Sequence, residues 1–447
     1  MKKILSLAFP LVISQLIAMA LVLTDVWMMS RISVSAIAAG GLGASVFFLI
    51  FMIASSTVGC VANLIAIAYG QRISRPEFGN QQIRLAIKGA VLLSVILSVV
   101  LLSLFAFAPN MLEWAQQPQE IIDLAMEYVN ALKWSMLPSL LLLVLRGLTS
   151  ALGNARSIMM MSVATVILNV PVSYVLAFPL GFGLAGLGAG TALAATIVML
   201  GYGAWVFSHA QYQQFAPWRN LEEYSIKLTL PLLKMGLPIA AAALLEHGLI
   251  YGGTLMAGTI SIAALALHQI LLQCLSFTWN VNFGFSQAAA ILVGRDFGAD
   301  NSEGIKRTVF KSFILVSIIS LVFSAIFIAW PGLVATFFGL TDQAMIDLLT
   351  AVIWIVAVSF IVDAWQLLAI NLLRGMKIVA TPTLLTAIGY WVVGLPAAWW
   401  LADKYGLGGI WAGIGIGLAA TGVLLLMLLV KAIRGEDTAT LAVSKGF

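Results

Sequence analysis

The sequence contains 447 residues, of which 62% are hydrophobic and 9% are charged, and its formal net charge is +5. Soluble domains carry about 25% charged residues, and so few charges cannot cover the surface of a soluble protein of this size. The composition therefore excludes a water-soluble fold. It predicts an integral membrane protein with about twelve spans, since one span takes ~20 apolar residues.

Apolar runs separated by charged and polar residues predict an all-α protein with twelve membrane helices. The first run follows Lys2 and Lys3 and is too long for the core of a signal peptide, so we expect it to be retained as a span. In chain order the predicted helices cover residues 4–30, 41–68, 84–108, 121–145, 157–178, 184–208, 230–257, 263–290, 307–330, 344–372, 382–402 and 408–431.

The longest connection between these runs is polar and divides six spans from six. We therefore expect an N-terminal six-helix lobe at 1–208, a linker at 209–229, a C-terminal six-helix lobe at 230–431 and a tail at 432–447. If the N-terminus is cytoplasmic, 20 of the 23 Lys and Arg residues fall on the cytoplasmic side. The positive-inside rule then predicts that both termini, the linker and the tail are cytoplasmic. The positive charge indicates contact with anionic membrane lipids rather than with nucleic acid.

Short segments recur in the same order in the two halves of the chain. Pro10 and Pro238 lie 228 positions apart, as do Arg146 and Arg374 within matching Leu-Arg-Gly triplets. Two further matches have offsets of 224 and 223 positions. With six spans in each half, this order indicates a parallel internal duplication.

Glycines spaced four apart are expected to lie at close helix contacts. They are Gly186 and Gly190, and in the last span Gly409, Gly413 and Gly417.

Three of the 18 acidic residues lie within predicted spans: Asp25, Glu246 and Asp363. A charged carboxylate at the centre of a membrane helix costs ~2.5–3.5 kcal/mol, so such residues mark functional sites by default. Asp25 could instead reach the headgroups, and the other two acids could belong to internal ion pairs. No basic residue is expected opposite them, because Arg374 is predicted at a cytoplasmic helix end beside lipid phosphates. Reversible binding of H⁺ or Na⁺ is the favoured interpretation, with Glu246 and Asp363 as the possible Na⁺ ligands.

Other polar and aromatic residues in the spans are further candidates. Asn169 precedes Pro171, which frees a backbone carbonyl, so Asn169 either faces a cavity or makes a helix–helix hydrogen bond. His247 could relay protons or simply pack. Trp365 and Tyr390 could stack on a cation or anchor the protein at the membrane interface.

An intramembrane hydrolase is the alternative from a different functional class. His268 and Ser286 are 18 residues apart on one predicted helix, which separates them by ~27 Å and prevents a catalytic dyad. No metalloprotease motif, nucleotide-binding loop or Cys/His cluster is present. We therefore expect a transporter that is not an enzyme and has no cofactor.

Several segments resemble the multidrug and toxic compound extrusion (MATE) transporters, and within them the NorM-type branch. The matching segments include Thr24-Asp25-Val26, Leu168-Asn169-Val170-Pro171, Leu245-Glu246, Val362-Asp363-Ala364-Trp365-Gln366 and Tyr390-Trp391-Val392-Val393-Gly394-Leu395-Pro396. Short loops and the absence of an Asn-x-Ser/Thr motif are compatible with a multi-pass protein of the bacterial inner membrane, and we expect a monomer. The resemblance implies two six-helix lobes. It also implies alternating access and export of cationic amphiphilic drugs and toxins in exchange for Na⁺ or H⁺.

The same resemblance assigns roles by position. Asp25 and Asn169 would belong to the cavity of the first lobe, and Glu246 and Asp363 would form a cation site in the second lobe. This sequence departs from the family pattern at Ser173, where an amide is common, at Ser359, where an aromatic is common, and at Met28-Met29-Ser30-Arg31. A flippase for a lipid-linked precursor, related in fold, is the nearest alternative transporter. Its phosphate-bearing substrate would favour a basic cavity, whereas the embedded charges here are mainly acidic.

Overall fold

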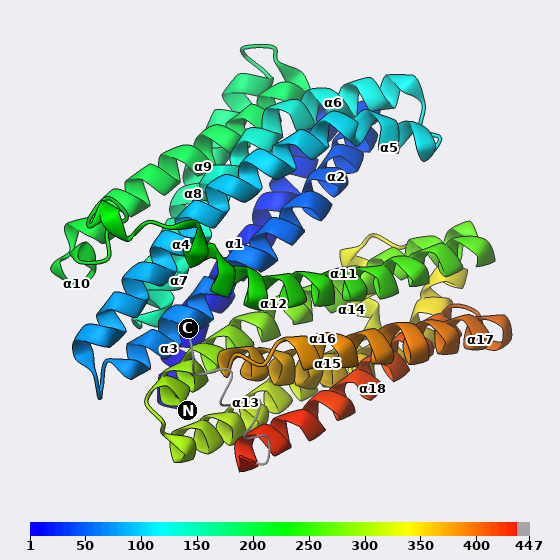
Figure 1. The fold of residues 1–447 in the computed structure, drawn as a ribbon. Coiled ribbons are helices and arrows are strands. Elements are labelled where there is room, and N and C mark those ends of the chain that lie inside the picture. The colour runs from blue at the N-terminus through cyan, green and yellow to red at the C-terminus, as the bar shows by residue number, and fades with distance from the viewer. Residues whose placement is uncertain (436–447) are drawn as a thin grey trace. The chain divides into compact units, whose positions relative to one another are not determined.

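A computed structural model describes residues 1–435 of the chain, and every regular element in that range is a helix (Figure 1). The α-helices are α1 (Lys2–Ile32), α2 (Val34–Gly59), α3 (Val61–Gln71), α4 (Pro76–Leu104), α5 (Ala108–Trp114), α6 (Gln119–Leu132), α7 (Met136–Ala151), α8 (Ala155–Ala177), α9 (Gly183–Ser208), α10 (Ala210–Gln213), α11 (Thr229–Ile260), α12 (Ile262–Gly298), α13 (Ser302–Ala329), α14 (Pro331–Phe337), α15 (Gln343–Gly375), α16 (Ala380–Ala387), α17 (Leu395–Tyr405) and α18 (Leu407–Arg434).

Twelve helical segments are long and apolar enough to cross a membrane, which confirms the predicted number of spans. Four of them each contain two α-helices. The second span joins α2 to α3 at Cys60, the third continues from α4 into α5, and the fourth joins α6 to α7 through a 3₁₀ turn at Lys133–Ser135. The eleventh consists of α16, a π-helical turn at Ile388–Gly394 and α17.

Large errors in the predicted boundaries occur where a helix begins or ends outside the apolar run that predicted it. The second span begins at Val34, seven residues before its predicted start, because the Ser33 side chain accepts a hydrogen bond from the Ala36 amide (2.9 Å) and caps the helix. Ser261 caps α12 in the same way, accepting from the Ala264 amide (3.0 Å). Helix α12 also continues eight residues beyond its predicted end. The positive charge of Arg295 in its last turn stabilises this extension by interacting with the negative end of the helix dipole.

The described chain divides into two compact units that differ from the predicted lobes at their edges. The N-terminal unit is Ile13–Ala240, and the C-terminal unit consists of Met1–Val12 together with the chain from Ala241 onward. Helices α1 and α11 each contribute to both units, and the predicted linker at 209–229 belongs wholly to the N-terminal unit. Most of the predicted tail, residues 436–447 including Lys445, lies outside the described residues.

Within the N-terminal unit, α9 packs against α6, α7 and α8, and α2 packs against α6 and α7. A buried cluster at one end of these helices contains Met28, Met29, Tyr128 and Leu132. Gly40 leaves room for the Met29 side chain, since a Cβ at position 40 would lie 2.8 Å from the Met29 Cε. The two methionines that depart from the family pattern therefore fill the core of this unit.

Within the C-terminal unit, α15 runs beside α12, α13 and α18, and α18 also packs along α17 (Figure 1). The core of this unit is apolar and aromatic, with Phe360, Tyr390 and Trp411 fully buried among Leu, Ile and Val side chains. The predicted close contacts of glycines in α18 are present. A Cβ at Gly417 would lie 2.8 Å from the Gly394 Cα, and one at Gly413 would overlap the backbone of Ala398.

The linker is fastened to α4 by a compact ion-pair cluster. The ammonium group of Lys88, which has no exposed side-chain surface, donates to the Glu223 Oε2 (2.9 Å) and to the Asn220 carbonyl (2.7 Å). Arg84 donates to the Glu223 Oε1 (3.0 Å). Burial raises the pKa of Glu223, but hydrogen bonds from Arg84 and Lys88 outweigh this effect and hold the pKa below its ordinary value.

Candidate functional site

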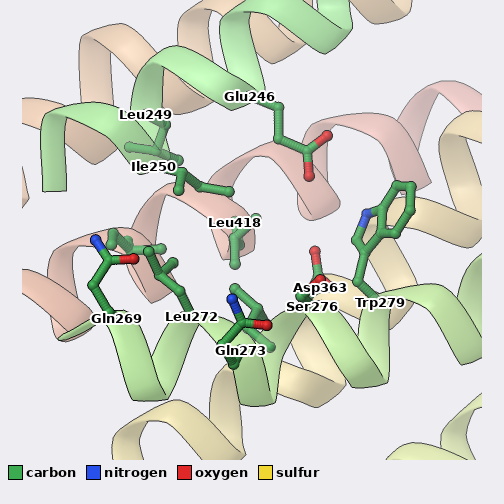
Figure 2. Close-up of a pocket in the computed structure, with 12 residues that line it drawn as sticks. Glu246, Leu249, Ile250, Gln269, Leu272, Gln273, Ser276, Trp279, Asp363 and Leu418 are labelled. Atoms are coloured by element: carbon green, nitrogen blue, oxygen red, sulfur yellow. The ribbon is translucent and has the colours of Figure 1, made fainter. Parts of the chain in front are cut away.

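Glu246 and Asp363 face one pocket in the C-terminal unit, with a cavity volume of about 290 Å³ (Figure 2). Four helices supply its walls: α11, α12, α15 and α18. The lining residues are Glu246, Leu249, Ile250, Gln269, Leu272, Gln273, Leu275, Ser276, Trp279, Asp363, Ile414 and Leu418. The site is thus mainly apolar, with two carboxyl groups and a few neutral polar groups.

The polar wall opposite Glu246 comes from α12. Gln269, Gln273 and Ser276 are spaced four and three residues apart, so they lie on one helix face, and Trp279 continues the same line one turn further on. None of these four residues was among the site residues predicted from the sequence. Their signal is a polar stripe on an otherwise apolar helix, but neutral polar residues occur on many spans, and only the fold shows which face lines a cavity.

The two acids differ in their surroundings. Asp363 is 2% exposed, and its Oδ2 has no hydrogen-bond partner within residues 1–435. Glu246 is only partly buried and interacts electrostatically with both Asp363 and Arg374. Two carboxylates that share an apolar pocket disfavour joint ionisation.

Arg374 lies at the expected helix end but has an unexpected partner. Sequence analysis placed it among lipid phosphates at a helix end, with no basic residue near the embedded acids. It does lie in the last turn of α15, but its charge acts on Glu246 within the C-terminal unit. A long arginine side chain can extend several ångströms from its Cα, which the predicted helix end did not take into account. Glu246 is therefore the better compensated of the two carboxylates.

The other two candidates from the first half of the sequence lie in the N-terminal unit. Asp25, on α1, is partly buried, its Oδ1 has no hydrogen-bond partner among the described residues, and it interacts electrostatically with Tyr128. Asn169, on α8, is 1% exposed; its Nδ2 donates to the Thr191 Oγ1 of α9 (3.3 Å) and its Oδ1 accepts from the Ser173 Oγ (3.3 Å). The helix–helix hydrogen bond considered for Asn169 is therefore present.

The remaining candidates are dispersed within the C-terminal unit. His247 is exposed and does not line the pocket. Trp365 points away from it, since its indole N–H donates to the Ser317 Oγ of α13 (2.7 Å). Tyr390 is fully buried on the π-helical turn and packs in the same core cluster as Leu249, which lines the pocket.

Residues 1–435 contain no group of three or more His, Cys, Asp and Glu side chains that could hold a metal ion. The monovalent coupling ion expected from the sequence stays a prediction.

Comparison with known proteins identifies the fold and the family. The sequence model described as MatE matches residues 10–175 and 238–400. The chain belongs to the MatE family. It is 32% identical over 423 residues to a probable multidrug resistance protein NorM of Bradyrhizobium diazoefficiens, covering 92% of this chain and 89% of that protein. A NorM protein of Pseudomonas putida is 31% identical over 436 residues, covering 95% and 93% of the two chains.

Solved structures show the same fold at lower identity. The outward-facing conformation of a multidrug resistance MATE family transporter superposes with a TM-score of 0.88 at 20% identity, covering 97% of this chain and 96% of that one. The eukaryotic MATE transporter AtDTX14 gives a TM-score of 0.85 at 17% identity, with 97% of each chain covered. Family and fold together make this MatE protein a multi-pass inner-membrane transporter rather than an enzyme, as the sequence predicted.

Proposed function

We propose that this MatE protein is a multidrug efflux antiporter that exports cationic amphiphilic compounds in exchange for Na⁺ or H⁺, as a monomer and by alternating access. Its bacterial relatives carry the name multidrug resistance protein NorM, which supports the substrate class. The coupling ion and the substrate are assigned here from the chemistry of the pocket.

The observation that carries the proposal is the meeting of Glu246 and Asp363 in one largely apolar pocket beside Trp279 (Figure 2). The apolar walls and the indole face suit the hydrophobic and cationic parts of an amphiphilic cation. The carboxylates attract the same positive charge and also bind Na⁺ or H⁺. Drug and coupling ion therefore compete for one charge-compensating site.

Competition couples the two fluxes. When the pocket faces outward, ion binding neutralises the carboxylates and lowers the affinity for the drug; when it faces inward, the ion leaves and the drug binds. One monovalent ion crossing −150 mV releases ~3.5 kcal/mol, which supports a gradient of a few hundred-fold for a neutral substrate. A monocation exchanged one for one cancels the electrical contribution, so its export requires the chemical gradient or a second ion.

Asp25 has a secondary place in the proposal. It is the third embedded acid, and its Oδ1 has no hydrogen-bond partner in the described chain. We assign to Asp25 a further protonation step of the cycle, carried out in the N-terminal unit, where Asn169 joins α8 to α9 by its hydrogen bond to Thr191. A flippase for a lipid-linked precursor is disfavoured, because the two carboxylates in the pocket would repel its phosphates.

The decisive experiment measures drug export with Na⁺ and pH varied separately. In proteoliposomes, Asp363→Asn and Glu246→Gln should each lower ion-driven export of ethidium by at least about tenfold, because each removes a charge that both ligands need. Cells that express either variant should lose resistance to ethidium and fluoroquinolones. Asp403→Asn, which changes an exposed acid on α17, is the matched control and should transport like the wild type. Undiminished export by both pocket variants would refute the assignment.

A further inference from the structure

The π-helical turn at Ile388–Gly394 is the least regular part of the eleventh span. A π-helical turn accommodates one extra residue per turn, and such turns occur frequently at functional sites. The local sequence favours it: Pro396 cannot donate a hydrogen bond to the carbonyl four residues earlier, and its ring crowds that carbonyl. Gly389 and Gly394 allow α18 to approach closely, since a Cβ at position 394 would lie 3.0 Å from the Gly417 Cα.

Two consecutive aromatic residues on this turn, Tyr390 and Trp391, both contact the C-terminal unit, one in its core and the other at α11. Tyr390 is fully buried in the core. Trp391 is 49% exposed, yet its indole N–H donates to the carbonyl oxygen of Leu245 on α11 (3.1 Å). Leu245 is the residue directly before Glu246.

A second contact holds the indole against the same turn of α11. Gly248 lies beneath it, and a Cβ at position 248 would lie only 2.6 Å from the Trp391 Cζ2. Trp391 therefore touches α11 on both sides of Glu246 in sequence, at positions 245 and 248. A helix turn held at these two points has little freedom to rotate, so the direction in which the Cα–Cβ bond of Glu246 leaves the helix is fixed with it.

We infer that Trp391 is a positioning residue for Glu246. The π-helical turn places its indole against α11, and this contact sets the affinity of the carboxylate pair for its ion. The inference rests on the proposed coupling role of Glu246 and assigns a function to a residue that does not line the pocket. Small displacements matter here, because carboxylates bind an ion together only when both point at the same place.

The ionisable groups that act on Glu246 are few. Asp363 and Arg374 come from α15, and Tyr390 comes from the π-helical turn. The walls of the pocket that belong to α12 and α18 carry no ionisable side chain. A change in ion binding after substitution of Trp391 therefore reports on the position of Glu246 relative to these three groups.

The experiment reads out Glu246 directly and does not require transport. Dicyclohexylcarbodiimide reacts with protonated carboxyl groups in apolar surroundings, and peptide mass mapping locates the product. Its rate of reaction at Glu246 is measured against pH at constant Na⁺, and against Na⁺ at constant pH, in the full-length protein. Trp391→Phe keeps an aromatic ring but removes the N–H, so the half-maximal H⁺ or Na⁺ concentration should shift by about 2- to 10-fold.

Gly248→Ala tests the same contact from the other side. Alanine favours a helix more than glycine does, so the substitution does not weaken α11 itself, but its methyl group displaces the indole. It should shift the half-maximal concentration in the same direction as Trp391→Phe does. Because both substitutions disrupt one contact, the double variant should shift it by a smaller factor than the product of the two single shifts. Trp399→Phe, at an exposed tryptophan of α17, is the control and should shift nothing.

Unchanged ion dependence in both Trp391→Phe and Gly248→Ala would overturn the inference, as would a wild-type Glu246 that does not react at any pH. A purely structural role would lower the melting temperature without shifting the ion concentration. A wild type whose Glu246 responds to the ion but which exports no drug would refute the proposed function and leave the role of Trp391 to be judged by the shifts alone.

Discussion

Lys88 is a buried charged side chain, and within residues 1–435 its charge is compensated by the linker. Glu223→Gln removes the negative charge and leaves the ammonium group with the Asn220 carbonyl and the neutral amide. We predict a loss of about 1.5–3 kcal/mol in the free energy of unfolding, the usual range for a hydrogen bond to a charged group. Lys88→Met should lower the free energy of unfolding by less, because Glu223 still pairs with Arg84 and remains accessible to water. Thermal unfolding in one detergent compares the variants.

The pH dependence of this effect has a definite sign. The pKa of Glu223 is lower in the folded protein than its ordinary value of 4.5. The ion pair therefore stabilises the fold fully above pH 4.5, and the stabilisation disappears as the pH falls below that value through the lower folded pKa. The difference in the free energy of unfolding between the wild type and Glu223→Gln should therefore be largest above pH 4.5 and should shrink as the pH falls below it. Glu303→Gln, which breaks an exposed pair with Lys306, is the control and should change stability by less than about 1 kcal/mol. An equal effect of both substitutions would contradict the prediction.

The sequence identified the charged members of the candidate site because charges are scarce in a membrane span. Glu246 and Asp363 stand out by chemistry alone, and the structure places both in one pocket. The neutral members, such as Gln269 and Gln273, could not be selected, because their types are compatible with either packing or binding. The direction of the Trp365 indole was equally beyond prediction, since it depends on the partner that the fold supplies, here Ser317.

At the scale of helices, the number and order of spans could be predicted because each span must be apolar along ~20 residues. The irregular turns within spans could not be predicted from the sequence. The 3₁₀ turn at Lys133–Ser135 and the π-helical turn at Ile388–Gly394 change the hydrogen-bond pattern without interrupting the apolar run. Helix ends followed caps such as Ser33, which lie inside or beside hydrophobic sequence and leave little trace in hydropathy.

Close packing of α17 on α18 gives a prediction at the same scale. Gly413→Ala would place its Cβ over the Ala398 backbone, so the two helices must separate. Overpacking costs about 1–3 kcal/mol, which outweighs the gain of about 1 kcal/mol in helix propensity. Gly408→Ala is the matched control on the same helix, because its Cβ would meet the side chains of Ile355 (3.6 Å) and Val352 (3.8 Å) at ordinary van der Waals distances. Thermal unfolding should show a lower melting temperature for the first variant and an unchanged or higher one for the second; the reverse order would refute this packing.

At the scale of the whole chain, three kinds of regularity have the same spacing. The Leu-Arg-Gly triplets, the capping residues Ser33 and Ser261, and the starts of the two segments that match the MatE family all lie 228 positions apart. A chain repeated in parallel places corresponding residues at the same depth in the membrane. The basic triplets at Arg146 and Arg374 should therefore lie on the same side as each other.

The charges predict the orientation of the chain in the membrane, and labelling of introduced cysteines can test it. The native Cys60 and Cys274 are buried, so alanine at both positions gives a background without reactive thiols. In that background, Gln211→Cys reports on the linker, whereas Ala115→Cys and Thr341→Cys report on connections predicted to lie outside; all three residues are exposed. A membrane-impermeant maleimide applied to intact cells should label positions 115 and 341 and spare position 211.

The control for this experiment is built into the same variants. After the membrane is permeabilised, position 211 should react as fast as the other two, which separates protection by the membrane from burial in the protein. The physical reason for the expected asymmetry is the cost of moving Lys and Arg across the membrane, which 20 of the 23 basic residues avoid in this orientation. Labelling of position 211 in intact cells, with 115 and 341 protected, would mean that the chain inserts the other way round. Equal labelling of all three would mean that both orientations occur, and the charge asymmetry would then need an explanation other than topology.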